Sequence, residues 1–167
     1  MSVQEHKSHA PPSVRCFVLT VSDTRTDATD TGGLAIRELL ASSGHVVSGH
    51  AIVRDDPGAV AGAIRQRLLD AETQVIVTTG GTGITSRDGT FEVIDGLLEK
   101  RLTGFGELFR MLSFEQIGAA AMMSRATAGT VGGKAIFALP GSPDAVRLAM
   151  TRLILPELGH VVQQLGR

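Results

Sequence analysis

Short runs of apolar and β-branched residues alternate along the chain with segments whose apolar residues recur at helical spacing. The run Val75–Thr79 has the composition of a strand buried on both faces. Comparable runs predict further strands at residues 14–21, 45–53, 126–131 and 135–139, the last two joined by Gly132-Gly133. Strands that alternate with helices at these distances predict a three-layer α/β/α sandwich with a mostly parallel central sheet.

Helical periodicity separates these strands. Leu34 to Ser43 has helical spacing and stops at Gly44, and a second helix begins with Asp56 as N-cap and Pro57 at its first position. A third helix is predicted to start at Thr90. The later segments are predicted as a linking turn, a helix, a tightly packed helix and two closing helices interrupted at Pro156, over residues 102–106, 107–113, 117–124, 145–154 and 157–165.

The chain is predicted to hold one domain. Residues 1–12 are polar and end in Pro11-Pro12, which favours a flexible N-terminal extension before a single domain over residues 13–167. No signal peptide is evident, and no apolar run approaches the roughly 18 residues of a membrane span. The single cysteine, Cys16, cannot form an internal disulfide. These features predict a cytoplasmic protein without a membrane partner.

Charge and composition exclude other classes. The formal net charge is −1, so the basic excess of a nucleic-acid binder is missing, and the chain has no Trp or Tyr to stack on bases. None of the five histidines stands at metal-ligand spacing to another ligand, which argues against a histidine-based zinc site. The sequence also lacks the glycine motifs of P-loop and dinucleotide-binding proteins and the nucleophile elbow of hydrolases.

The chemistry is concentrated after Val75–Thr79, where the chain reads Gly80-Gly81-Thr82-Gly83 and then Arg87-Asp88. Glycines free the backbone to approach a ligand closely, and successive N–H groups can form an anion site. The alternative is that the glycines form only a tight turn, with Asp88 as a helix cap and Arg87 as its ion-pair partner. We expect a phosphate or anion site here.

Carboxylates follow three of the predicted strands. Asp23 follows the first strand, Asp55 and Asp56 follow the second, and Asp88 follows the glycine turn. The carboxyl ends of parallel strands share one edge of the sheet, where ligands bind in open α/β folds. Two carboxylates beside a phosphate pocket suit Mg²⁺. Asp56 is more simply explained as the helix N-cap, and Asp23 could equally cap a turn.

An ordered set of motifs resembles the MoaB/MogA family of molybdenum cofactor biosynthesis, and its MoaB branch most of all. The resemblance runs from about Val14 to Leu165. Its motifs are Thr20-Val21-Ser22-Asp23, Thr79-Gly80-Gly81-Thr82-Gly83, Arg87-Asp88, Met123-Ser124-Arg125-Ala126, Ala128-Gly129 and Leu139-Pro140-Gly141-Ser142-Pro143.

The resemblance implies a molybdopterin-binding fold that assembles as a homo-oligomer, a trimer or a hexamer, and works beside other proteins of the pathway. It implies adenylylation of the terminal phosphate of molybdopterin by Mg-ATP, with release of pyrophosphate. Asp55 and Asp88 match the family's two essential acidic positions, which hold Mg²⁺. The substrate contacts it implies are Ser22, Asp23, Gly80, Gly81, Thr82, Gly83, Ser124, Arg125, Pro140, Gly141, Ser142 and Pro143.

Two alternatives stay open. Arg125 suits a phosphate because its planar fork can donate two parallel hydrogen bonds, but a surface or intersubunit salt bridge would equally explain it. The whole protein could also be a non-catalytic accessory or scaffold protein that binds molybdopterin or a nucleotide without turning it over.

Overall fold

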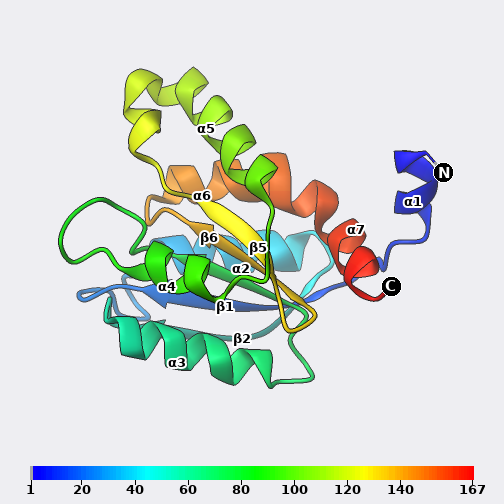
Figure 1. Cartoon of the computed structure of the whole chain (residues 1–167), viewed down its shortest axis with the longest axis horizontal. Coiled ribbons are helices and arrows are strands. Elements are labelled where there is room, and N and C mark those ends of the chain that lie inside the picture. Colours follow the sequence, from blue (N-terminus) through cyan, green and yellow to red (C-terminus); the bar gives the residue numbers. More distant parts are fainter. Residues whose placement is uncertain (1) are drawn as a thin grey trace.

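The computed structural model of the chain describes residues 2–167, and six strands form one central sheet in the order β2-β1-β3-β6-β5-β4 (Figure 1). β2, β1, β3 and β6 are parallel, whereas β5 and β4 run antiparallel to their neighbours. The mostly parallel sheet is thereby confirmed. The strands are β1 Arg15–Val21, β2 Val46–Val53, β3 Val75–Thr79, β4 Lys100–Arg101, β5 Thr127–Val131 and β6 Lys134–Leu139.

Helices cover both faces of the sheet, so the three layers of the predicted sandwich are confirmed (Figure 1). α3 and α4 lie on one face, and α2, α5, α6 and α7 lie on the other. The helical segments are α1 Val3–Ser8, α2 Thr31–Ser42, α3 Pro57–Leu68, α4 Thr90–Leu97, α5 Thr103–Ile117, the 3₁₀ helix η1 Gly118–Met123, α6 Pro143–Ala149, the π-helical turn η2 Met150–Ile154 and α7 Leu155–Leu165.

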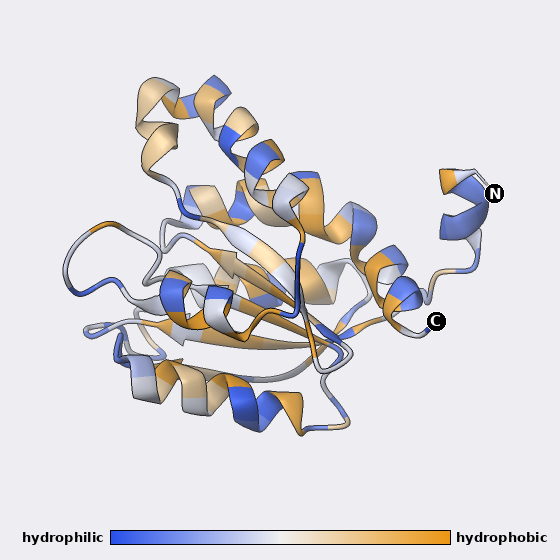
Figure 2. Ribbon diagram, viewed as in Figure 1, coloured by the Kyte–Doolittle hydropathy of each residue, from blue (hydrophilic) through white to orange (hydrophobic). Residues whose placement is uncertain are grey.

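The central strands are buried on both faces because successive side chains point into different cores. In β1, Cys16 and Val18 pack beneath α2 and α5, while Phe17 and Leu19 pack against α3 and α4. Burial raises the pKa of the Cys16 thiol to about 12, so Cys16 is a small apolar core residue. Figure 2 shows largely hydrophobic strands at the centre, between helices along which hydrophilic and hydrophobic residues are mixed.

Two helix starts depend on aspartate caps. Asp56 accepts a hydrogen bond from the Ala59 N–H at 2.9 Å and Pro57 follows it, as predicted. The prediction that α2 begins at Leu34 is wrong, because Asp30 caps the helix by accepting from the Gly33 N–H at 2.9 Å. The cap holds Gly32 and Gly33 in the first turn, although glycine alone disfavours a helix.

Asp30 is the buried N-cap of α2. We therefore expect Asp30→Ala to lower the free energy of unfolding by about 2–3 kcal/mol. Its side chain is 4% exposed, and its Oδ2 also accepts from the Thr20 Oγ1 at 2.7 Å. Urea denaturation followed by circular dichroism measures the loss. A change below about 0.5 kcal/mol would show that water replaces both hydrogen bonds.

The region after β4 differs from prediction. The linking turn predicted for residues 102–106 is wrong, because α5 begins at Thr103 and buries Phe105 against Phe137 in an edge-to-face contact. The tightly packed helix predicted for residues 117–124 is also wrong. Gly118, with φ +66°, ends α5, and the short 3₁₀ helix that follows leaves Met122 81% exposed. Tertiary packing on β5 and β6 overrides the local glycine signal at Gly104 and Gly106.

The closing helices are continuous, so the predicted break at Pro156 is wrong. A proline cannot donate to the carbonyl four residues before it. The π-helical turn Met150–Ile154, directly before α7, accommodates the missing hydrogen bond without a break in the helix. Lys100–Arg101 is a two-residue strand that the hydrophobic pattern did not predict, since both of its residues are exposed.

Within the predicted N-terminal extension, Val3–Ser8 form α1, whose N-terminus is closed by a capping box between Ser2 and Glu5. Lys7 forms an ion pair with Glu157 of α7, and the ring of His6 stacks on His160. Among residues 2–167, none of the helices is long and apolar enough to cross a membrane.

Candidate functional site

The glycine turn after β3 requires glycine at two successive positions. Gly80 and Gly81 have φ of +94° and +72°, in the region that favours glycine. A Cβ on Gly80 would lie 2.2 Å from the Val21 carbonyl oxygen, and one on Gly81 would lie 1.9 Å from Thr90 Oγ1. The turn is therefore packed tightly between β1 and α4, with its backbone at the surface of a pocket.

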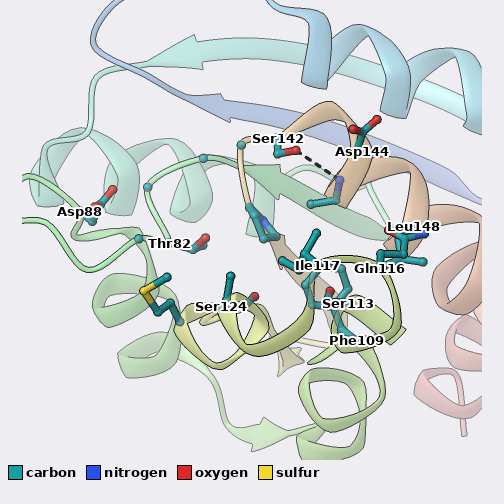
Figure 3. A pocket seen from close by; sticks show the side chains of 18 residues that line it. Thr82, Asp88, Phe109, Ser113, Gln116, Ile117, Ser124, Ser142, Asp144 and Leu148 are labelled. Carbon is teal, nitrogen blue, oxygen red and sulfur yellow. Dashed lines mark hydrogen bonds between the residues drawn. The ribbon is translucent and has the colours of Figure 1, made fainter. Parts of the chain in front are cut away.

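That pocket has a volume of about 530 Å³ and lies between the glycine turn, α5 with η1, and the start of α6 (Figure 3). It brings together most of the predicted substrate contacts. Those that line it are Gly80, Gly81, Thr82, Gly83, Ser124, Pro140, Gly141 and Ser142, together with the predicted metal ligand Asp88. One wall is polar backbone and the other is largely apolar side chains.

A second pocket of about 360 Å³ adjoins the first and shares Gly80, Gly141 and Ser142 with it. Ser22 and Pro143, also predicted contacts, line this second pocket beside Arg25. The two pockets form one continuous recess along the carboxyl ends of β1, β3 and β6. Such a recess has room for two ligands or for one elongated ligand.

Asp55 lies behind the glycine turn and is 7% exposed. Its Oδ1 accepts a hydrogen bond from the Gly89 N–H at 3.3 Å, and its own N–H donates to Asp23 Oδ1 at 3.1 Å. Burial raises the pKa of Asp55, and the negative charges of Asp88 and Asp23 add to the rise. The ionised form of Asp55 is therefore disfavoured in the free protein, and a bound cation would stabilise it.

The surroundings of Asp88 favour its ionised form, in contrast to those of Asp55. Its Oδ2 accepts from the Thr85 hydroxyl at 2.6 Å and from the Thr85 N–H at 2.9 Å, and the hydroxyl is the main reason that its pKa is lowered. The predicted alternative of an Arg87–Asp88 pair is not formed. Arg87 instead donates to Asp23 Oδ2 at 2.8 Å. Asp88 therefore stays ionised at the edge of the pocket.

Two predicted contacts, Asp23 and Arg125, line neither of these two pockets. Asp23 lines a separate surface recess beside β2, and Arg125 lies elsewhere. Arg125 lines a recess of about 350 Å³ between α4, the start of α5 and residues 124–127. Its guanidinium forms an ion pair with Glu92 and donates to the carbonyl oxygens of Thr82 and Gly83. Of the two alternatives left by the sequence, a salt bridge is formed, within the chain.

Several residues that line the first pocket were not predicted from the sequence. α5, η1 and α6 supply a largely apolar wall with three polar side chains, made of Phe109, Ser113, Gln116, Ile117, Ala120, Met123, Asp144, Ala145 and Leu148. Their only signal in the sequence is an excess of apolar residues near Ile117 and Met123, which reads as core packing. The fold brings them to the glycine turn from 26 to 68 residues away in sequence, counting from Gly83 to Phe109 and from Gly80 to Leu148.

The two carboxylates fit a magnesium ion better than a metal that needs a full protein cage. Asp55 Oδ2 would be 3.1 Å from a Cβ placed on Gly81, so it lies directly against the turn. Within residues 2–167, no group of three or more His, Cys, Asp or Glu side chains could hold a metal. Mg²⁺ commonly uses one or two carboxylates and takes its other ligands from phosphate and water.

Comparison with known proteins identifies the family of this chain. The family model described as a probable molybdopterin binding domain matches residues 17–160. Molybdenum cofactor biosynthesis protein B of Bacillus cereus is 52% identical over 168 residues, which cover 100% of this chain and 99% of that protein. By fold and by sequence, the chain is a domain of this molybdopterin-binding class.

Two solved structures make the assignment more specific. A crystal structure of molybdenum cofactor biosynthesis protein B superposes with a TM-score of 0.92 at 50% identity, covering 95% of this chain and 99% of the other. The tungsten cofactor synthesizing protein MoaB from Pyrococcus furiosus superposes with a TM-score of 0.80 at 38% identity, covering 95% and 100%. The chain belongs to the MoaB/MogA family of molybdenum cofactor biosynthesis proteins.

Proposed function

We propose that this protein binds molybdopterin and Mg-ATP in the recess formed by the two adjoining pockets and transfers AMP to the terminal phosphate of molybdopterin. The observation that carries the proposal is the placement of Asp55 and Asp88 beside the glycine turn that lines the pocket. A glycine turn next to two carboxylates suits phosphate groups held together with a divalent cation.

In the proposed reaction, an oxygen of the molybdopterin phosphate attacks the α-phosphorus of ATP. A new P–O bond forms to that oxygen as the bond from the α-phosphorus to the α,β-bridging oxygen breaks, and pyrophosphate leaves with the electron pair. The attacking phosphate is ionised near neutral pH, so no side chain has to remove a proton. The residues of the site therefore act by positioning and by balancing charge.

Each part of the site has a place in this scheme. Asp55 and Asp88 would hold Mg²⁺, which neutralises charge that develops on the phosphates. The turn Gly80–Gly83 and the segment Pro140–Pro143 present backbone groups and the Ser142 hydroxyl to the polar part of the ligands. The apolar wall of α5 and η1 would cover a flat ring and exclude water from the phosphates.

The proposal includes a homo-oligomer, a trimer or a hexamer. In its support, α5 and η1 project from the body of the molecule (Figure 1). Large apolar side chains on them are exposed, with Met111 53% and Phe114 61% accessible. Exposed apolar side chains gathered on one element mark contact surfaces. Sedimentation that showed a stable monomer would remove the oligomer from the proposal.

The direct test is to incubate purified protein with molybdopterin, ATP and MgCl₂ and to look for adenylylated molybdopterin and pyrophosphate. We expect both products in equal amounts, and neither when EDTA replaces MgCl₂. Tight molybdopterin binding without any product would contradict the transfer and leave an accessory protein that binds the pterin. That outcome would keep the fold and pocket but remove the catalytic role of Asp55 and Asp88.

A further inference from the structure

All three nitrogens of the Arg125 guanidinium are engaged within the protein. Nε donates to the Thr82 carbonyl oxygen at 3.1 Å, and Nη2 donates to the Gly83 carbonyl oxygen at 2.5 Å. Nη1 pairs with Glu92 of α4, and the guanidinium carbon lies 4.9 Å from the centre of the Phe91 ring. Arg125 thus ties the second half of the glycine turn to the first turn of α4.

These contacts fix the direction of two peptide groups. Among residues 2–167 all peptide bonds are trans, and in a planar trans peptide the C=O and the following N–H point in opposite directions. With the Thr82 carbonyl held toward Arg125, the Gly83 N–H points to the other side of the chain. Asp88 packs against this part of the turn: a Cβ placed on Gly83 would lie 2.6 Å from Asp88 Oδ2 and 3.0 Å from its Cγ.

We infer that Arg125 is a positioning residue that acts on Asp88 through the Thr82–Gly83 peptide group. It holds the Thr82–Gly83 peptide group against the Asp88 carboxylate and so fixes the place of that carboxylate at the edge of the pocket. Arg125 itself lines neither of the two proposed substrate pockets, and its side chain is 26% exposed in the recess between α4 and α5. The kinetic part of the inference rests on the proposed adenylyl transfer, whereas the geometric part does not.

Glu92 gives the sharpest test, because it contacts Arg125 and lines neither substrate pocket. If Arg125 bound substrate, Glu92→Gln would release the guanidinium and leave the KM for molybdopterin equal or lower. A positioning role predicts instead that Glu92→Gln and Arg125→Ala both lower kcat, by about 5-fold and about 50-fold, with each KM within about 3-fold of the parent value. Arg125→Lys should restore only part of the rate, because one ammonium group cannot reproduce the planar fork.

A readout independent of turnover is the amide proton resonance of Gly83 in ¹⁵N-labelled protein. Arg125→Ala and Asp88→Asn should both shift it, because each changes the contact between the Gly83 backbone and the carboxylate. Arg101→Ala is the matched control: it removes a comparable ion pair, with Asp95, that does not reach the glycine turn. It should leave both the resonance and kcat unchanged.

An unshifted Gly83 resonance in folded Arg125→Ala protein would overturn the inference, as would a raised KM for molybdopterin with kcat retained. If the parent protein forms no adenylylated product, the proposed function fails, but the resonance still decides the role of Arg125. If the resonance shifts as expected while kcat of Arg125→Ala equals that of the parent, the positioning role is overturned for catalysis. Thermal melting of each variant confirms that the compared proteins are folded.

Discussion

Asp55→Asn is expected to abolish adenylyl transfer, by at least about 10³-fold in kcat, while making the folded protein more stable. The loss of activity follows because a neutral amide cannot balance the charge of Mg²⁺ as a carboxylate does. The gain in stability follows because Asp55 is buried against the glycine turn near two other carboxylates, so its ionised form is disfavoured in the folded state. Removing that charge should add about 1 kcal/mol at neutral pH.

The sign follows from proton binding. Burial raises the pKa of Asp55 in the folded state, so folding favours its protonated form. The parent is therefore penalised above the unfolded-state pKa, and the penalty disappears as the pH falls below it. The stability advantage of Asp55→Asn should be fully present at pH 7 and should shrink as the pH falls through the folded pKa. Denaturant titrations at several pH values measure it.

Asp88→Asn is the matched comparison, because the proposal gives both residues the same role while their environments differ. The Thr85 hydroxyl stabilises the ionised form of Asp88 and lowers its pKa, so the charge favours the fold above the unfolded pKa. We expect Asp88→Asn to lose activity and to lose up to about 1 kcal/mol of stability, a deficit that fades as the pH falls through the folded pKa. If Asp55→Asn and Asp88→Asn lost the same amount of stability, the two carboxylates would not differ in environment as described.

The parts predicted from the sequence are those that local patterns determine. The order of strands and helices followed from hydrophobic periodicity, and the Asp56 cap with Pro57 followed from residue type and position alone. The helix starts at Thr31 and Thr103 did not, because glycines that read as turns are held in helices there by the Asp30 cap and by burial of Phe105. Local signals could not weigh those tertiary contacts.

For the pocket, too, only the parts that follow from local patterns and strand order could be predicted from the sequence. The glycine turn and Asp88 were predicted at this site because parallel strands end at one edge of a sheet, whereas the segment after β6 was implied by the family resemblance. The wall made by α5 was missed, since nothing local to Phe109 or Gln116 indicates that this helix folds back over the turn. The internal contacts of Arg125 could not be predicted from the sequence either, because its partners Thr82 and Glu92 are 43 and 33 residues away.

Gly81→Ala is expected to be the most damaging substitution that changes no polar group, with a loss of roughly 3–5 kcal/mol of stability and of at least about 10²-fold in kcat. The backbone at Gly81 has φ +72°, which is strained for alanine. The added Cβ would also lie 1.9 Å from Oγ1 and 2.8 Å from Cβ of Thr90, which is fully buried and cannot move aside. The turn or the start of α4 has to shift.

Two further variants separate strain from steric conflict. Gly62→Ala in α3 is the control, because a Cβ there meets nothing within 4 Å, and alanine in a helix should stabilise by about 0.5–1 kcal/mol. Combining Gly81→Ala with Thr90→Gly removes both close contacts but leaves the strained φ, so it should recover part of the loss. Full recovery of melting temperature and kcat would mean that the clash alone requires glycine, whereas no recovery would place the whole requirement in the backbone conformation of the turn.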